Sequence, residues 1–364
     1  MMDAIDSLSA PRSAGVGEPS KPSLVHPWAD GLLVGWLGVG LWAFAVFAPA
    51  PAVAILNNST ALLWTATAVQ AAHFAMSYRL SYADGARALR QHPIALGLFP
   101  LVLAVVTVGI AIVAASAGVA AVQSVTSFLI SAVFITSGFH FVRQSYGVAR
   151  IGFSYAKASL QPWENRALRL AVYPIWLVGL RPLLSDQGGI GYLGFEVGPA
   201  ILNGAVFACL EAAAWIAVAS VVAVYLRVWS RGVRPTGLMV APYAVIVVWM
   251  IAPIGQIAAA SLAFSLVHAL QYLACCYRVE RNRAGGEGIP GLVTWFYVVV
   301  VAACLGIVAT RGLPGWLDQT WGTPGQPLLF SALAFVYLNL THYVTDAVIW
   351  KSSGSLLKPR LHSG

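Results

Sequence analysis

The chain has 364 residues, of which 59% are apolar and only 9% are charged, whereas soluble domains carry about 25% charged residues. So few charges cannot cover the surface of a soluble protein of this size, and the missing polar surface indicates faces that contact lipid. The net charge of +8 does not indicate nucleic-acid binding, because the basic residues are scattered between apolar runs. The composition therefore excludes a soluble multidomain protein and a nucleic-acid-binding domain.

The two ends of the chain differ from its middle. Residues 1–27 are polar and rich in Ser and Pro, without the charged-then-apolar order of a cleaved signal, and we expect a disordered cytoplasmic tail. Residues 351–364 have a similar composition, and we expect a second cytoplasmic tail there. The segment between them, 28–350, is predicted to form one all-α bundle of transmembrane helices, because it contains repeated apolar runs of about 20 residues.

Ten apolar runs are candidate membrane spans, in chain order 30–50, 60–78, 94–115, 122–142, 167–184, 198–226, 236–253, 256–277, 290–310 and 327–350. The fifth is the weakest, because it is short and contains Pro174. All 21 Lys and Arg residues except Arg181 and Arg311 lie in the tails or near the loops that follow the even-numbered spans. Since positively charged loops stay in the cytoplasm, both termini are predicted to lie there. Losing or merging two spans would preserve this alternation, so eight spans are an alternative.

Four of the seven histidines lie inside the candidate spans: His73, His140, His268 and His342. Each belongs to a different even-numbered span, so all four helices are predicted to run toward the cytoplasm. At 1.5 Å of rise per helical residue, the four rings lie about 9 to 15 Å from the basic boundary of their spans. They are therefore expected to form a layer in the inner half of the bilayer.

A polar residue accompanies each of these histidines one helical turn away. The partners are Ser77 for His73, Gln144 for His140, Gln271 for His268 and Asp346 for His342. Spacings of three or four residues place each partner on the same helix face as its histidine. A single membrane histidine usually makes only a hydrogen bond between helices, but four at one depth indicate a shared site facing the bundle interior. Tyr146, Tyr272 and Tyr343 are candidates to line a pocket there.

Four neutral imidazoles suit a first-row transition metal, and neighbouring carboxylates or amides serve as further ligands or orient the imidazoles. We therefore predict a metal site held by the four histidines, with iron as the favoured metal. Asp346 is a candidate to bind the metal directly or to orient His342 or a bound water, and Asp346, Gln144 and Gln271 would tune the metal or move protons. Glu211, expected near the middle of the sixth span, is a further candidate ligand or proton carrier. A haem held between two of the helices is the alternative cofactor.

The segments around three of the histidines are Ser-Gly-Phe-His-Phe-Val-Arg-Gln-Ser-Tyr-Gly (137–147), Val-His-Ala-Leu-Gln-Tyr (267–272) and Thr-His-Tyr-Val-Thr-Asp-Ala-Val-Ile-Trp (341–350). Single histidines spread over several spans at one depth, in a chain of this length, resemble the Brp/Blh family of integral-membrane β-carotene cleavage dioxygenases. The resemblance implies one iron bound by histidines from different helices, here carried over to His73, His140, His268 and His342. It also implies cleavage of a lipid-soluble polyene with O2.

The favoured function is a multi-pass membrane oxidoreductase, in a membrane of the bacterial inner-membrane type, that acts on a hydrophobic small molecule reaching the site from the bilayer. One alternative is a proton- or metal-ion-coupled transporter, in which the histidines and acidic residues form a relay. A second is a subunit whose histidines bind a haem or pigment for a partner complex. The sequence assigns no oligomeric state and no single substrate.

Overall fold

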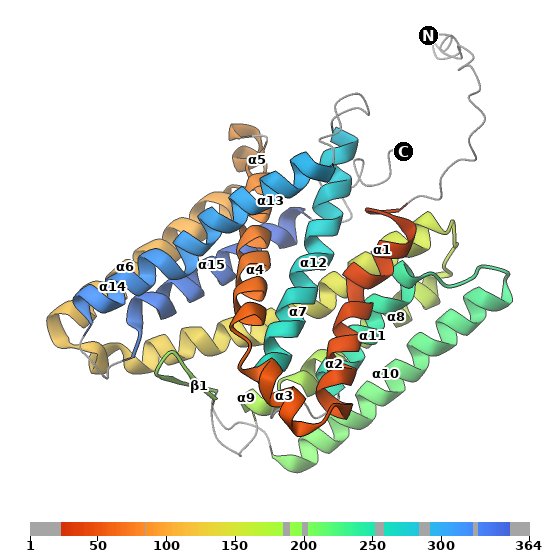
Figure 1. Cartoon of the computed structure of the whole chain (residues 1–364), viewed down its shortest axis with the longest axis horizontal. Coiled ribbons are helices and arrows are strands. Elements are labelled where there is room, and N and C mark those ends of the chain that lie inside the picture. Colours follow the sequence, from red (N-terminus) through yellow and green to blue (C-terminus); the bar gives the residue numbers. More distant parts are fainter. Residues whose placement is uncertain are drawn as a thin grey trace, which may run out of the picture.

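Helices make up almost all of the described chain, and Figure 1 shows them gathered in one bundle. The computed structural model describes residues 23–83, 85–184, 190–198, 203–251, 258–283, 292–322 and 327–349. The first half contains α1 (Pro27–Gly31), η1 (Leu32–Trp36), α2 (Leu37–Phe47), α3 (Ala50–Asn57), α4 (Thr60–Ser81), α5 (Ala86–Gln91), η2 (Ile94–Leu98), α6 (Phe99–Ala117), η3 (Val119–Val122), α7 (Gln123–Tyr155), α8 (Pro162–Gly179) and α9 (Arg181–Leu184). The second half contains β1 (Ile190–Tyr192), β2 (Phe195–Val197), α10 (Gly204–Ser230), α11 (Gly237–Ile251), α12 (Ala258–Arg283), α13 (Leu292–Ile307), η4 (Val308–Gly312), α14 (Leu313–Trp321) and α15 (Leu329–Ile349).

Every one of the ten expected spans overlaps a helix, or two or three helical pieces joined end to end. Five helical segments are long and apolar enough to cross a membrane: Pro27–Phe47, Ile94–Ala117, Val119–Tyr155, Gly204–Ser230 and Thr294–Trp321. The all-α helical bundle predicted from the sequence is confirmed, and these five segments identify a membrane protein. The number of crossings and the orientation of the bundle stay predictions.

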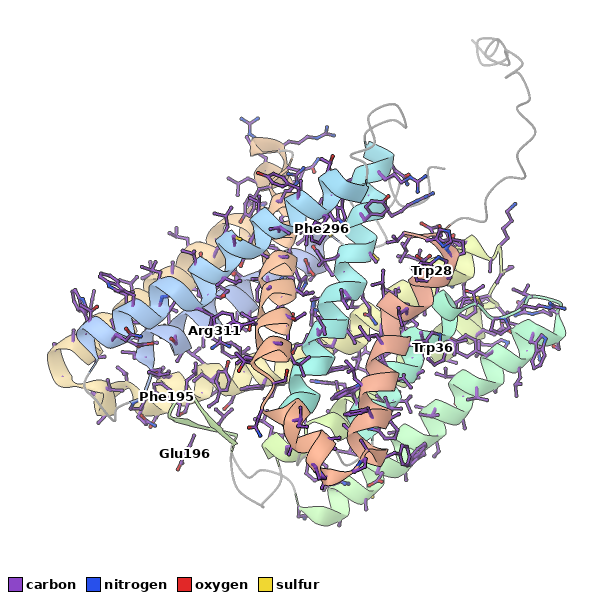
Figure 2. The ribbon with its side chains drawn as sticks, viewed as in Figure 1. Trp28, Trp36, Phe195, Glu196, Phe296 and Arg311 are labelled. Atoms are coloured by element: carbon purple, nitrogen blue, oxygen red, sulfur yellow. The ribbon has the colours of Figure 1, made fainter. Side chains whose placement is uncertain are left out.

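The outward faces of several of these segments are apolar. Val105, Phe128, Ile216, Phe296 and Leu305 are each at least 65% exposed, and Figure 2 marks Phe296 on one such face. A soluble protein rarely exposes contiguous apolar surface of this kind. These faces are therefore suited to contact the acyl chains of lipids.

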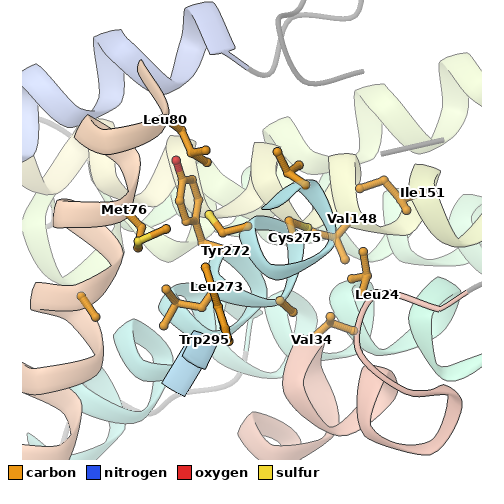
Figure 3. Close-up of a cluster of buried hydrophobic side chains, with 14 of the residues drawn as sticks. Leu24, Val34, Met76, Leu80, Val148, Ile151, Tyr272, Leu273, Cys275 and Trp295 are labelled. Carbon is orange, nitrogen blue, oxygen red and sulfur yellow. The ribbon is translucent and has the colours of Figure 1, made fainter. Parts of the chain in front are cut away.

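Helices α4 and α12, which carry His73 and His268, lie side by side in the middle of the bundle and run in the same direction (Figure 1). Figure 3 shows Met76 of α4 and Tyr272 of α12 facing one another within a buried apolar cluster. On its other side, α4 packs against α13, where a Cβ atom on Gly306 would lie 2.5 Å from the backbone oxygen of Ala71. Small residues allow such close approach of membrane helices, and here the glycine brings α13 against the helix that carries His73.

Side-chain hydrogen bonds cap the first turns of α4 and α15, the helices that carry His73 and His342. The Ser59 hydroxyl accepts a hydrogen bond from the Leu62 amide (3.1 Å) at the start of α4. The Asp318 carboxylate on α14 accepts from the amides of Phe330 (2.7 Å) and Ser331 (2.9 Å) in the first turn of α15. Free amides at a helix start need such acceptors. The contact from Asp318 also joins α15 to the preceding helix.

A short hairpin departs from the all-helical expectation. Strands β1 and β2 pair antiparallel, with Tyr192 opposite Phe195. Leu193 and Gly194 both have positive φ angles, 55° and 85°, which is the backbone that a two-residue hairpin turn requires. Phe195 is buried and Glu196 is exposed, and in Figure 2 the Glu196 side chain points away from the bundle.

Residues 23–27, the last part of the expected N-terminal tail 1–27, pack against the bundle. Leu24 is fully buried, and its amide donates to the Asp30 carboxylate (2.7 Å). The amides of Val25 (2.9 Å) and His26 (3.2 Å) donate to the same carboxylate. Residues 1–22 and the expected tail 351–364 lie outside the described residues.

Candidate metal site

Four histidines meet in the interior of the bundle: His73 on α4, His140 on α7, His268 on α12 and His342 on α15, here called the histidine cluster. Their rings contact one another in a closed circuit, with ring-centroid distances of 4.9 Å for His73–His268, 4.9 Å for His268–His140, 5.1 Å for His140–His342 and 4.4 Å for His342–His73. Each neighbouring pair lies edge to face. The four histidines predicted from sequence to share a site therefore do lie together.

The ring nitrogens of the histidine cluster are buried without partners. Three of the side chains are at most 3% exposed, and that of His140 is 13% exposed. Among the described residues, seven of the eight ring nitrogens are buried and lack a hydrogen-bond partner, the exception being Nδ1 of His140. A buried polar atom left unpaired costs about 1–3 kcal/mol. Each neutral imidazole carries a lone pair on one of its two nitrogens, so a metal ion bound by all four rings would take up four of these seven nitrogens.

The spacing of these nitrogens fits one metal ion. One nitrogen from each ring lies within 4.8 Å of the corresponding nitrogens of the other three. With metal–nitrogen bonds of about 2.1 Å, nitrogens lie about 3.4 Å apart around a tetrahedral ion and about 4.2 Å apart across an ion. The histidine cluster therefore needs only small side-chain movements to place four nitrogens around a common centre.

Asp346, on the same helix as His342, lies directly beside the histidine cluster and is 2% exposed. Its Oδ1 accepts hydrogen bonds from the Ser77 hydroxyl (2.6 Å) and the Tyr272 hydroxyl (3.1 Å). Its Oδ2 lies 3.6 Å from Nε2 of His140 and 3.5 Å from Nε2 of His342. The carboxylate thus places an oxygen atom of the kind that binds metal ions beside the four imidazoles.

Gln144 and Gln271 bond to backbone and to each other. The Gln144 amide donates to the backbone oxygen of His268 (2.8 Å) and to Oε1 of Gln271 (3.1 Å). The Gln271 amide donates to the backbone oxygen of Val34 (2.6 Å) in η1. The two glutamines thereby join α7, α12 and η1 next to His268, and Oε1 of Gln144 is buried without a hydrogen-bond partner among the described residues.

Four aromatic rings surround the histidine cluster. They are Phe141 against His268, Tyr272 against His73, Tyr343 against His140 and Phe74 against His342, with ring-centroid distances of 4.1, 4.5, 4.7 and 5.0 Å. Tyr272 and Tyr343 were expected from the sequence, whereas Tyr146 donates instead to Asn165 on α8 (3.0 Å). Phe74 and Phe141 were missed, although an aromatic residue directly after the histidine, as at positions 74, 141 and 343, is a visible signal.

Glu211 lies apart from the histidine cluster. Its carboxylate pairs with Arg181 of α9 (2.8 Å) and is 39% exposed. The sixth helix begins at Gly204, later than the expected start of the span at 198, so Glu211 lies near the helix start instead of its middle. Helix α10 also packs mainly against α8, which carries none of the four histidines.

The side chains on one side of His268 pack so closely that no space for a water molecule remains between them. They include the apolar side chains of Phe141, Phe264, Val245 and Val267. The ring of Phe141 separates His268 from Phe264, with centroid distances of 4.1 and 5.0 Å. The surroundings of the histidine cluster on this side are therefore mainly apolar and closely packed.

Comparisons of the chain with protein-family models, with curated proteins and with solved structures found no match.

Proposed function

We propose that the protein is a membrane-embedded, metal-dependent oxidoreductase that acts on a hydrophobic, lipid-soluble substrate, and that its metal is non-haem iron. The observation that carries the proposal is the histidine cluster. Its four rings come from four helices, and their nitrogens lie within 4.8 Å of one another. Its burial in an apolar bundle supports chemistry that is kept away from water.

Non-haem iron is favoured by the donors and by the packing of the rings. Imidazole and carboxylate are the ligands of many non-haem iron sites, and both are present here. A haem would have to lie between two of the histidines. The four rings contact one another at centroid distances of 4.4 to 5.1 Å, so a porphyrin would require them to part.

Bound iron would supply Lewis acidity and electron transfer to O2, which is the oxidant in this proposal. The chain's own residues hold the iron and orient its ligands. Asp346 presents a carboxylate beside two of the imidazoles, and Gln144 and Gln271 fix the position of α12. The aromatic rings around the histidine cluster exclude water from it.

A lipid-soluble substrate is supported by the apolar side chains packed beside His268 and by the exposed apolar faces of the bundle. A molecule dissolved in the bilayer would approach between helices and displace the ring of Phe141. The apolar side chains beside His268 would offer it mainly dispersion contacts, which suit an apolar molecule such as a polyene. The resemblance to β-carotene dioxygenases agrees with this class.

The first experiment measures metal. The full chain, purified in detergent, should contain or take up about one iron per chain, measured by elemental analysis. His342→Gln should weaken Fe(II) binding by more than about 100-fold, because the amide replaces an inner ligand. His92→Gln, the same substitution outside the histidine cluster, is the control and should leave binding unchanged. A chain that takes up no metal would refute the proposal.

The second experiment measures reaction. Iron-loaded protein in nanodiscs should consume O2 when a carotenoid, a quinol or an unsaturated fatty acid is present, and His342→Gln should not. Protein in proteoliposomes should move neither protons nor Fe(II). Ion flux that needs the histidine cluster, without O2 consumption, would favour the transporter. A purified chain with the visible spectrum of a haem or pigment would favour the cofactor-binding subunit.

A further inference from the structure

The two carboxylate oxygens of Asp346 have different surroundings. Oδ1 is anchored by the hydroxyls of Ser77 on α4 and Tyr272 on α12. Oδ2 is buried and has no hydrogen-bond partner in the part of the chain that the structure describes. Because the anchors come from two other helices, they fix the rotation of the carboxylate. One oxygen is thus held by protein donors, while the other faces the histidine cluster.

The distances from Oδ2 match those between two ligands of one metal. Oδ2 lies 3.6 Å from Nε2 of His140 and 3.5 Å from Nε2 of His342. A charge-assisted N–H···O hydrogen bond is about 2.7–2.9 Å long. Two atoms bound at about 2.1 Å to the same metal lie about 3.0–3.6 Å apart for angles of about 90–120°. Oδ2 has this spacing to both nitrogens, so it behaves as a member of the cluster.

We propose that Asp346 is a fifth metal ligand, which binds through Oδ2 beside the four imidazoles. The inference rests on the proposed function, since it requires a metal in the histidine cluster. Four imidazoles and one carboxylate suit Fe(II) or Mn(II) better than the softer Cu(I). Ser77 and Tyr272 are then positioning residues, because their bonds to Oδ1 hold Oδ2 toward the metal.

The competing role for Asp346 is to orient a histidine by accepting an N–H hydrogen bond, as carboxylates do around many metal sites. In that case one imidazole would bind the metal through Nδ1 and donate from Nε2. The two roles differ in the number of atoms bound to the metal. A measurement of coordination number therefore separates them.

Asp346→Asn is the informative variant. The amide oxygen of asparagine still accepts from Ser77 and Tyr272, while an NH2 group that does not bind metals replaces Oδ2. Asp318→Asn is the matched control, because it makes the same change at a buried carboxylate that caps α15. The full-length protein in detergent is titrated with Co(II), whose visible absorption strengthens as its coordination number falls to four.

We expect Asp346→Asn to weaken Co(II) binding by more than the 10–100-fold typical of a residue that only orients a ligand, and to strengthen the absorption. Asp318→Asn should change neither. An unchanged spectrum in Asp346→Asn would overturn the inference and leave the metal site intact. A wild-type chain that takes up no Co(II) and no Fe(II) would refute the proposed function as well.

A measurement on the wild-type chain alone guards against a variant that fails to fold. X-ray absorption of the Co(II)-loaded protein counts the nitrogen and oxygen atoms bound to the metal. Five or more support Asp346 as a ligand. Four contradict it, while the histidine site itself would stand.

Discussion

The inner helices α4, α12 and α15 differ from the outer segments α6 and α10 in how they satisfy their polar groups. The inner three have 22, 26 and 21 residues. In their described residues, however, none is apolar enough to be a candidate membrane span, whereas the segments that contain α6 and α10 are. They carry His73, His268, His342 and Asp346, all buried against one another. High hydropathy therefore accompanies the exposed faces of α6 and α10, whereas the polar residues of α4, α12 and α15 are buried where they contact polar residues of neighbouring helices.

Removing the metal should affect the inner helices most. A metal present at about 1,000 times its Kd stabilises a protein by about 4 kcal/mol. Treatment with a chelator should therefore lower the thermal unfolding temperature of the full chain clearly. Variant His342→Gln should show little further decrease. An equal response of wild type and variant would show that the histidine cluster does not hold the metal.

A charge on an outer helix should be the next largest effect. Val105 lies at the middle of the segment Ile94–Ala117 and is 65% exposed. Val105→Asp should reduce membrane insertion by about 2.5–3.5 kcal/mol, because no helix satisfies the carboxylate. Val105→Ala is the control for the loss of the side chain. The readout is the fraction inserted in a translocon-based assay, and normal insertion of Val105→Asp would show that this face does not contact lipid.

The contact between α13 and α4 tests how an outer helix supports the inner site. Gly306→Ala would place a Cβ atom 2.5 Å from the backbone oxygen of Ala71, and overpacking of this kind costs about 1–3 kcal/mol. Thermal unfolding in detergent should show the loss, together with weaker metal binding through displacement of His73.

The matched control for Gly306→Ala is Gly109→Ala on α6, where an added Cβ atom meets nothing within 4 Å. This control should be neutral or slightly stabilising, because alanine favours a helix more than glycine does. Equal stability of the two variants would argue against close packing of α13 on α4.

The smallest effect is expected at the start of α15. Asp318→Ala removes an acceptor for the amides of Phe330 and Ser331, and loss of such a cap costs about 0.5–2 kcal/mol. The free energy of unfolding measures it, with the exposed neighbour changed in Gln319→Ala as control. Metal affinity should fall by less than in any variant of the histidine cluster. An equally large loss of stability in Gln319→Ala would show that Asp318 does not act as a cap for α15.

The helices and the histidine cluster could be predicted from the sequence because both depend on composition along the chain. Apolar runs give the helices, and ionisable residues inside those runs have to face the interior. The spacing of Asp346 from His342 indicated a shared helix face. It did not indicate the bonds of Asp346 to Ser77 and Tyr272, because contacts between helices depend on how the helices are rotated in the bundle.

The errors have local causes. Glu211 was expected near the middle of a span, but the helix begins six residues later and the carboxylate finds Arg181, thirty residues earlier in the chain. The hairpin 190–197 is too short to show a strand periodicity, and its signal is the Leu193-Gly194 turn. The Asp30 carboxylate accepts hydrogen bonds from the backbone amides of residues 24–26, at the end of the segment whose composition predicted a tail. Composition alone does not indicate this contact.

The most direct test of the central claim is X-ray absorption at the iron edge of the full-length protein, combined with elemental analysis. We predict about one iron per chain and scattering from four imidazole rings around it. A chain that retains no metal, or a metal bound by fewer than four imidazoles, would contradict the claim that the histidines of α4, α7, α12 and α15 share one ion.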